Sequence, residues 1–432
     1  MEGKKSAVNP SPKKILIITY YWPPSGGSGV QRWMYFAKHL KLLGYEPIVI
    51  TVNETQASYP VLDLSLMKEV EGIRIIKTKT REPLRWYSRL ISGNPQKGIP
   101  QGEIQTSSIF GKVATYIRGN FFIPDARKGW IPFAVRAAQK VLRQEKIQCL
   151  ITTGPPHSTH LAGLQLASQF ELKWWVDFRD PWTDIFYNKQ MRRTHKSQAK
   201  DAALEKRILQ NAKGVITTTA GELHQRLQQK APEQTFIALP NGYDAELMRN
   251  TEAAPKKKGF HIVFTGLLTR NQAYARVVEV LQELSQGHIL HFSLAGNINP
   301  SLIAEIKKSL PKVEVEYHGY LPHAQAIALM KSANLLLNFI FKGAETQMIS
   351  GKLLEYMATA VPILSLGDPT STAAQFLSQG SQAWMVEEED TTTMKRYIKG
   401  MLEQKKQPKN KTPQLEEWSR AALTKRLVNE VL

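Results

Sequence analysis

Glycine and serine residues that suit a ligand-binding loop cluster near the start of the chain, as Gly26, Gly27, Ser28 and Gly29. Glycines let backbone N–H groups approach a ligand closely, and a helix start favours phosphate or a sugar hydroxyl. The cluster lacks the G-x-G-x-x-G fingerprint of dinucleotide sites and the Lys-Ser/Thr pair of a Walker A loop. A tight strand–helix turn is the structural alternative. We favour ligand binding because open α/β sheets bind ligands at the carboxyl ends of their strands.

A second polar loop, GPPHSTH at residues 154–160, also follows an apolar run. Ser158 or Thr159 can cap the helix predicted after it. His157 then lies where a side chain enters a ligand cleft, and histidine can bind or exchange protons near neutral pH. This pattern supports a structural role and a role in a site equally.

Charged residues gather in VDFRDPWTD, residues 176–184. Arg179 can pair with a carboxylate in a buried network, and such a structural role suits Asp177 best. Arg179 and Asp180 would then remain available to sugar hydroxyls or phosphate. We therefore expect His157, Arg179 and Asp180 to form the catalytic set.

The sequence SGKLLEYM at residues 350–357 predicts a helix that starts after a loop. Lys352 near that start can reach a diphosphate. Glu355 lies three residues later on the same helical face, where its carboxylate can accept both hydroxyls of a ribose. The alternative is an exposed Lys–Glu pair that contributes little to stability.

Alternating strand and helix patterns must position these loops. Residues 15–21 form an apolar run, residues 30–43 have helical spacing and residues 47–51 resume a strand, which predicts a βαβ unit. The alternation restarts after a polar linker at residues 250–259. We predict an α/β protein with two Rossmann-like, doubly wound domains and an interdomain cleft. The first spans residues 1–250, with an insertion at about residues 81–128, the second spans residues 259–410, and a helix is expected within residues 411–432.

The charge balance is strongly basic, with 57 Lys and Arg against 37 Asp and Glu and a formal net charge of +20. Basic stretches at residues 81–140 and 189–213 would attract anionic partners, although a solvated face is equally consistent with either stretch. The chain has no helix-turn-helix, zinc or RNA-binding signature, so we expect no nucleic acid. An anionic inner-membrane surface is the partner that fits better.

The chain also lacks a recognisable membrane-inserting segment. No run approaches the roughly 18 apolar residues of a membrane span. The polar residues 1–14 lead into a strand pattern without a cleavage site. The single cysteine, Cys149, can form no internal disulfide and fits a reducing compartment. We expect a cytoplasmic protein, with peripheral association at the inner face of the plasma membrane.

Read together, four segments resemble glycosyltransferase family 4, which has the GT-B fold: GGSGVQR, PNGYD at residues 240–244, the Thr265-Gly266 strand end and SGKLLEYMATAVPIL. GPPHSTH and DFRDPWTD are similar to a bacterial branch that makes surface polysaccharides. The resemblance spans nearly the whole chain. It implies a retaining transfer of a sugar from a nucleotide-sugar donor to a glycan or lipid-linked acceptor, with no metal or other cofactor. It also implies that the C-terminal helix crosses back to the first domain.

The resemblance assigns roles to individual residues. Glu355 would bind the donor ribose, Lys352 the nucleotide region and His157 the transferred sugar, and Gly27 would lie against the donor phosphate or the acceptor. The full expected donor-binding set is Gly26, Gly27, Ser28, Asn241, Gly266, Arg270, Ser350, Gly351, Lys352 and Glu355.

The chain departs from the family pattern at two places. Gln347 stands where a second acidic residue is expected, eight positions before Glu355. Leu267 and Leu268 stand where Arg and Lys are usual, so that Arg270 is the substitute cation for the diphosphate. Two other functions keep the same sequence features: a sugar-nucleotide epimerase of related fold, and a non-catalytic basic protein that binds nucleic acid or an anionic surface.

Overall fold

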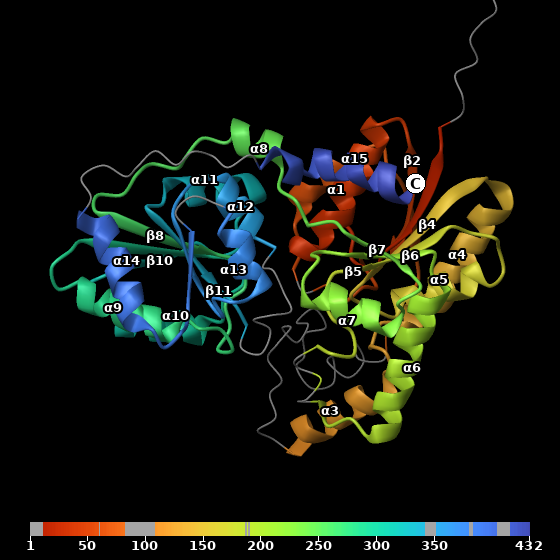
Figure 1. Cartoon of the computed structure of the whole chain (residues 1–432), viewed down its shortest axis with the longest axis horizontal. Coiled ribbons are helices and arrows are strands. Elements are labelled where there is room, and N and C mark those ends of the chain that lie inside the picture. The colour runs from red at the N-terminus through yellow and green to blue at the C-terminus, as the bar shows by residue number, and fades with distance from the viewer. Residues whose placement is uncertain are drawn as a thin grey trace, which may run out of the picture.

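The computed structural model describes residues 12–59, 61–82, 109–185, 188, 191–341, 351–379, 383–403 and 415–432. The chain forms two bodies side by side, each built around one parallel β-sheet with helices on both faces (Figure 1). The chain passes from the first body to the second near α8 (Ala245–Asn250) and returns to it in α15 (Arg420–Val431).

The first sheet has seven parallel strands in the order β3-β2-β1-β4-β5-β6-β7. Their bounds are β1 (Lys14–Ile18), β2 (Glu46–Val52), β3 (Arg74–Thr78), β4 (Ile147–Gly154), β5 (Trp174–Phe178), β6 (Gly214–Thr217) and β7 (Thr235–Ala238).

Alternate residues of a strand point to opposite faces, and both faces of the first sheet are covered. Ile15 and Ile17 of β1 pack in one cluster with α1 (Ser28–Leu42), η1 (Leu64–Val70) and α15. Leu16 and Ile18 pack in the other with α4 (Ile131–Gln144), α5 (Thr159–Ala167), α6 (His195–Asn211) and α7 (Glu222–Lys230). The carboxyl ends of the strands are therefore left to loops.

The second sheet has six parallel strands in the order β10-β9-β8-β11-β12-β13. They are β8 (Phe260–Thr265), β9 (Leu290–Ala295), β10 (Glu314–Tyr317), β11 (Leu335–Phe339), β12 (Ile363–Leu366) and β13 (Ala383–Val386). Helices α9 (Ala275–Leu284), α10 (Pro300–Ser309) and α14 (Thr391–Glu403) pack on one face. Helices α8, α11 (His323–Ser332), α12 (Leu353–Ala358) and α13 (Thr372–Leu377) pack on the other.

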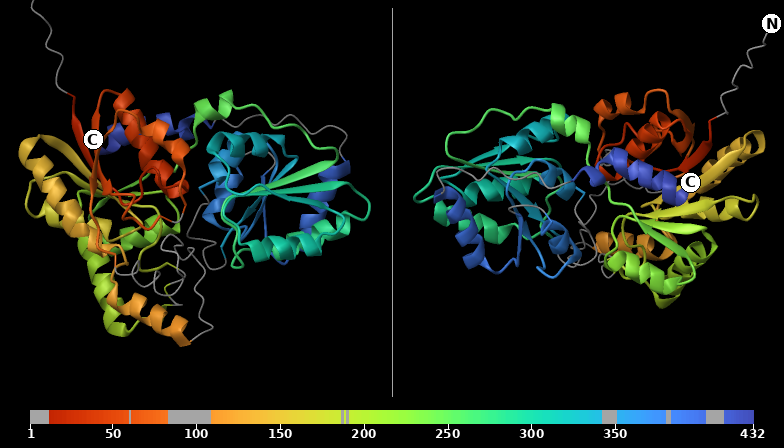
Figure 2. Two further views of the ribbon diagram at one scale, coloured as in Figure 1. Left: turned by 180° about the vertical axis from the view of Figure 1, so that it is seen from behind. Right: turned by 45° about the horizontal axis from the view of Figure 1, so that its top comes forward.

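Helix α15 lies on α1 of the first body, although it ends the chain (Figure 2). Its residues Leu423, Leu427 and Val431 belong to the same buried cluster as Ile17 and Trp33. A short helix, η4 (Glu416–Trp418), leads into it. The last segment of the chain is thus part of the core of the first body.

The remaining elements lie around the predicted insertion. Helix α3 (Ile109–Phe121) packs against α6, and η2 (Lys128–Trp130) leads into α4. Residues 83–108 of the insertion lie outside the described residues. Among the helices that the structure describes, none has the length and apolar character that spanning a membrane requires.

Candidate functional site

Lys352 immediately precedes α12 and lies against the carboxyl end of β8. Its Nζ donates a hydrogen bond to the Thr265 carbonyl oxygen over 2.8 Å and lies 3.8 Å from the centroid of the Phe264 ring. The Tyr356 hydroxyl, one turn later, accepts a hydrogen bond from the Thr265 N–H over 2.8 Å. Burial lowers the pKa of Lys352 to about 7, because a buried ammonium loses its hydration. The helix start thus presents a cation whose charge changes near neutral pH.

Two glycines shape the backbone beside this lysine. Gly266 follows β8 with a φ of +113°, and Gly296 follows β9 with a φ of +123°, a region that favours glycine. A Cβ atom on Gly296 would clash with the Gly266 backbone, and one on Gly266 would lie 3.3 Å from Lys352 Nζ. The glycines therefore allow the two strand ends to approach each other and leave space for the lysine.

Glu355 lies one turn along α12 and is held through one carboxylate oxygen. Its Oε1 lies 2.8 Å from His323 Nε2 at the start of α11 and 3.3 Å from Arg420 Nη2 at the start of α15. Burial by itself would raise the pKa of Glu355, but His323 and Arg420 together hold that pKa below its ordinary value. The carboxylate is thus stabilised in its charged form, which accepts hydrogen bonds from hydroxyl groups.

The other residues of the second body that the sequence analysis named lie in different surroundings. Arg270 Nη1 pairs with Glu305 Oε2 on α10 over 2.8 Å. Leu268 is buried, and its backbone forms a parallel bridge with Ile298. Gly351 directly precedes Lys352, whereas Ser350 and Gln347 lie outside the described residues. The structure therefore directs Arg270 to α10 and brings Lys352 and Gly266 together.

The glycine loop of the first body meets a tyrosine of the second body. The Gly26 N–H donates to the Val61 carbonyl oxygen over 2.9 Å, and a Cβ atom on Gly26 would lie 2.9 Å from the Tyr320 hydroxyl. Tyr320 in turn donates to Asp63 Oδ2 over 3.1 Å. Gly27 has a φ of +96° with open space around its Cβ position, and the next residue, Ser28, begins α1. The loop is thus part of the contact between the two bodies.

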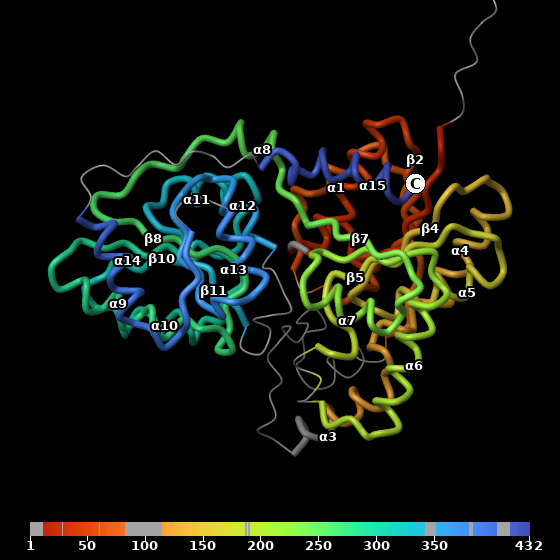
Figure 3. Tube along the Cα trace, viewed as in Figure 1, coloured from red at the N-terminus to blue at the C-terminus, as the bar shows by residue number. Residues whose placement is uncertain are grey.

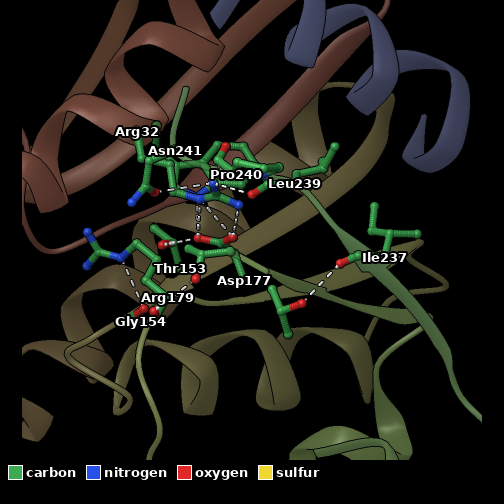
Figure 4. A network of polar contacts seen from close by, with 12 residues as sticks. Arg32, Thr153, Gly154, Asp177, Arg179, Ile237, Leu239, Pro240 and Asn241 are labelled. Atoms are coloured by element: carbon green, nitrogen blue, oxygen red, sulfur yellow. Dashed lines mark hydrogen bonds and ion pairs between the residues drawn. The ribbon is translucent and has the colours of Figure 1, made fainter. Parts of the chain in front are cut away.

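Asp177 lies at the centre of a buried network that joins several loops (Figure 4). It accepts hydrogen bonds from Arg32 Nη2 over 2.8 Å, Trp33 Nε1 over 2.6 Å and Thr153 Oγ1 over 2.7 Å. The buried partner of Asp177 is therefore Arg32 of α1. Asp177 thus has the structural role in a buried network that the sequence suggests. Its partner is Arg32 and not Arg179, because Arg179 is directed to backbone carbonyl groups.

Arg32 also reaches the PNGYD turn after β7. Its Nη1 donates to the Leu239 carbonyl oxygen over 2.7 Å, to the Pro240 carbonyl oxygen over 3.0 Å and to Asn241 Oδ1 over 3.4 Å. Asn241 thus serves the buried arginine in this structure, and its position ties the turn to α1.

Arg179 ties together the loops after β1 and β4. Its Nε donates to the Gly154 carbonyl oxygen over 3.1 Å, and its two terminal nitrogens donate to the carbonyl oxygens of Gly29 and Pro155. These bonds use three of the five N–H groups of the guanidinium and hold it against the backbone. For Asp180, burial raises the pKa of the carboxyl group, and the neighbouring Arg179 only partly opposes that effect.

His157 is buried and stacks on aromatic rings. Its ring lies 5.1 Å from the Trp182 ring, at an interplanar angle of 8°, and 5.6 Å from the Phe178 ring. Neither ring nitrogen makes a well-aligned hydrogen bond within the described residues. Burial lowers the pKa of His157 well below its ordinary value, and the neighbouring His160 lowers it further. A neutral, buried imidazole that interacts with the Pro181 backbone therefore lies in this loop.

The helix after this loop begins differently from the sequence prediction. Ser158 does not cap α5 with its side chain. Its N–H and its hydroxyl instead donate to the two carboxylate oxygens of Asp125, over 2.7 Å and 2.8 Å. The capping prediction is wrong for Ser158, because its backbone has helical angles, φ −54° and ψ −25°, and not the extended angles of a capping residue.

Four residues at or near this site escaped the sequence reasoning: Arg32, Tyr320, His323 and Arg420. Arg32 lies inside the GGSGVQR sequence, so the motif includes it, but nothing in the motif indicates Asp177 as its partner. The others stand apart from the motifs, and their contacts join segments distant in sequence. Among the described residues, no group of three or more His, Cys, Asp and Glu is arranged to hold a metal ion.

Comparison with known proteins agrees with this architecture. Residues 259–404 match the family model described as "Glycosyl transferases group 1". No curated protein matches the chain significantly in sequence.

Three solved structures share the fold at low sequence identity. A sucrose-phosphate synthase from Thermosynechococcus elongatus has a TM-score of 0.61 at 15% identity, with 97% of this chain and 94% of that chain covered. A glycosyltransferase from Rickettsia africae has a TM-score of 0.55 at 13% identity, with the same coverage of 97% and 94%. A lipopolysaccharide outer core galactosyltransferase has a TM-score of 0.57 at 11% identity, covering 96% of this chain and 98% of that chain. The predicted GT-B fold, with two Rossmann-like domains, is confirmed.

Proposed function

We propose that this protein is a glycosyltransferase that moves a sugar from a nucleotide-sugar donor to a glycan or lipid-linked acceptor. One observation carries the proposal: Lys352, at the start of α12, lies against the carboxyl end of β8, and Glu355 follows one turn later on the same helix. Both residues lie within the segment that matches the glycosyltransferase family model. A cation and a carboxylate one turn apart can bind a diphosphate and a ribose together. In parallel α/β sheets this edge is where ligands bind.

In this proposal the residues of the chain act by binding and charge stabilisation. Lys352, with Arg270 after a change of partner from Glu305, offsets the charge that develops on the leaving diphosphate. The backbone of Gly27 contacts the donor phosphate or the acceptor, and His157 contacts the transferred sugar. The acceptor hydroxyl attacks on the face that the nucleotide leaves, so that configuration is retained. No metal or other cofactor takes part, because the cationic side chains supply the positive charge.

A hexosyl donor and a role in bacterial surface polysaccharide synthesis are the finer parts of this proposal. They rest on the GPPHSTH and DFRDPWTD segments. The fold shared with a lipopolysaccharide galactosyltransferase is consistent with them.

We also propose that the enzyme works in the cytoplasm, on an anionic membrane surface. Helices α3 and α6 form the part of the first body that lies farthest from α15 in Figure 1. Tyr116, Ile117 and Phe121 of α3 are exposed, and exposed basic residues follow nearby at Arg192, Lys196 and Lys200. The acidic residues of the same segments are engaged, Asp125 by Ser158, Asp201 by Arg193 and Glu205 by Lys230. Exposed apolar and basic side chains together favour an anionic bilayer.

The donor proposal is tested by thermal denaturation of the protein with uridine, guanosine, adenosine and cytidine diphosphates and their glucose conjugates. A ligand that binds only the folded state raises the melting temperature. We expect one nucleotide to do so and Glu355→Ala to abolish the shift, with an exposed α14 variant, Lys399→Ala, as the control. If no nucleotide raises the melting temperature, the donor proposal is wrong.

The membrane proposal has its own test. We expect the protein to sediment with vesicles that contain phosphatidylglycerol and to remain in solution with phosphatidylcholine vesicles. A Phe121→Ser, Lys196→Gln variant should lose this binding, whereas Lys399→Gln should retain it. Equal sedimentation with both lipids, or none with either at low salt, would contradict an anionic membrane partner.

A further inference from the structure

Arg420 contacts both bodies of the molecule through one guanidinium group. Its Nη2 donates to Gln31 Oε1 of α1 over 2.8 Å and lies 3.3 Å from Glu355 Oε1 of α12. The guanidinium carbon lies 3.9 Å from the centroid of the Tyr35 ring. Gln31 and Tyr35 belong to the first body, whereas Glu355 belongs to the second.

The backbone fixes Arg420 at the point where the chain crosses between the bodies. The Tyr243 N–H donates to the Trp418 carbonyl oxygen over 3.3 Å, and the Arg420 N–H donates to the Tyr243 carbonyl oxygen over 3.0 Å. The outgoing and returning segments therefore run side by side at Tyr243 and Arg420, close to α8 and the start of α15 in Figure 3. The side chain of Arg420 consequently starts from a well-defined position.

Arg420 is buried, with a relative exposure of 5% for the whole residue. Its Nε and Nη1 are also buried and have no hydrogen-bond partner among the described residues. An arginine that serves only to stabilise the fold usually has all its buried donors satisfied. In Arg420, Nη2 alone contacts both the Gln31 side chain and the Glu355 carboxylate, so that one nitrogen links α1 to α12.

We propose that Arg420 is a positioning residue of the donor site, which orients the Glu355 carboxylate from the C-terminal helix. The inference rests on the proposed function, because it takes Glu355 to be the ribose-binding residue. The donor site of the second body is then complete only when α15 is seated on α1 of the first body. Binding of the nucleotide-sugar donor and packing of the two bodies against each other are therefore coupled through this one side chain.

The proposal has a pH signature that a purely structural role would lack. The titratable groups that interact with Glu355, besides Arg420, are His323 of α11 and Tyr356 of α12. The Tyr35 ring beside Arg420 also interacts with the carboxyl groups of Asp244 and Glu69. Arg420 lowers the pKa of Glu355, and its removal therefore raises that pKa. A protonated Glu355 cannot accept from both ribose hydroxyls, so that loss of Arg420 should weaken donor binding most at low pH. His323 is present in wild type and variant alike, and comparing them isolates Arg420.

Titration calorimetry measures the dissociation constant of the nucleoside diphosphate that binds wild type most tightly. The measurements run from about pH 4.5, close to the ordinary pKa of a glutamate side chain, to about pH 8. The variants are Arg420→Gln, Arg420→Lys, Gln31→Ala and, as a matched control on α15, Arg426→Gln. Arg426 is exposed and pairs with Glu430 on its own helix. Circular dichroism melting of each variant shows whether it folds.

We expect Arg420→Gln to weaken binding by about tenfold near neutral pH, with a ratio to wild type that grows as the pH falls. Arg420→Lys should restore most of the affinity. Gln31→Ala should weaken binding by a ratio that does not depend on pH, and Arg426→Gln should match wild type. Folded Arg420→Gln protein with wild-type affinity at every pH, or with a constant ratio to wild type, would overturn the inference. If wild type binds no nucleoside diphosphate, it is the proposed function that fails.

Discussion

The ammonium group of Lys352 is buried at the carboxyl end of β8, so that its charge should control the binding of a diphosphate there. A protonated Lys352 attracts a diphosphate, whereas a neutral one does not. Because burial lowers the pKa of Lys352 to about 7, we expect the affinity for nucleoside diphosphate to fall as the pH rises from about 6 to about 8.5. Titration calorimetry of wild type and Lys352→Met measures this. The variant should bind weakly throughout, and an equal pH dependence in both proteins would show that another group titrates.

The buried Arg32–Asp177 pair allows a prediction about stability. Both side chains are fully buried in this pair, and removal of one partner leaves an uncompensated buried charge. We expect Asp177→Ala to lower the free energy of unfolding by about 3–5 kcal/mol. The exposed pair Lys77–Glu54 provides the control, since Glu54→Ala should cost less than about 1 kcal/mol. Urea denaturation followed by tryptophan fluorescence separates the two outcomes, and similar losses would mean that Asp177 is not the centre of the network.

At this scale the sequence indicated residue types better than partners. Lys352, Glu355 and Gly266 were recognised from their motifs, and the structure places Lys352 against Gly266. The Asp177 partner could not be found, because Arg32 lies 145 positions away and a closer arginine, Arg179, was available. Only the folded sheet brings α1 and β5 together.

At the scale of elements, periodicity was a good guide where both faces of a strand are buried. Residues 15–21 were predicted as a strand and β1 covers Lys14–Ile18, while the helical spacing over residues 30–43 corresponds to α1, Ser28–Leu42. Strand β3 was missed because it is the edge strand of its sheet and keeps exposed Arg74 and Lys77 among its apolar residues. Helix α6 was interpreted only as a basic stretch, because its surface lysines hide the buried Ile208 and Leu209.

The loops at the carboxyl edge of the first sheet are coupled through Gly29. A Cβ atom there would lie 2.6 Å from Arg179 Nη1, and the arginine would have to leave the carbonyl groups that it joins. We expect Gly29→Ala to lower the free energy of unfolding by about 1–3 kcal/mol and to increase hydrogen exchange in the loops after β1 and β4. Gly400→Ala, in α14 with open space around it, should instead stabilise by about 0.5–1 kcal/mol. Unchanged exchange in Gly29→Ala would show that Arg179 does not couple the loops.

At the scale of the whole molecule, the two bodies are joined by side-chain contacts as well as by the covalent chain. Tyr320 of the second body reaches Asp63 and the glycine loop of the first, and Arg420 reaches Glu355 from α15. The sequence predicted a terminal helix in residues 411–432, and the resemblance implied its return to the first domain. It could not show that the first residue of this helix would contact the predicted ribose-binding carboxylate, because that contact depends on how the two bodies pack.

The C-terminal helix α15 should contribute to the stability of the whole molecule, because it is part of the core of the first body. Although Leu427 is the sixth residue from the end of the chain, it is fully buried in the cluster that contains Trp33 and Trp175. We expect Leu427→Ala to lower the free energy of unfolding by about 2–5 kcal/mol, as for other large-to-small core substitutions. Lys425→Ala, at an exposed position of the same helix, should change it by less than about 0.5 kcal/mol. Urea denaturation followed by tryptophan fluorescence measures both. Near-identical effects would mean that α15 is not seated on α1 in solution, and the same loosened helix would then also fail to hold Arg420 against Glu355.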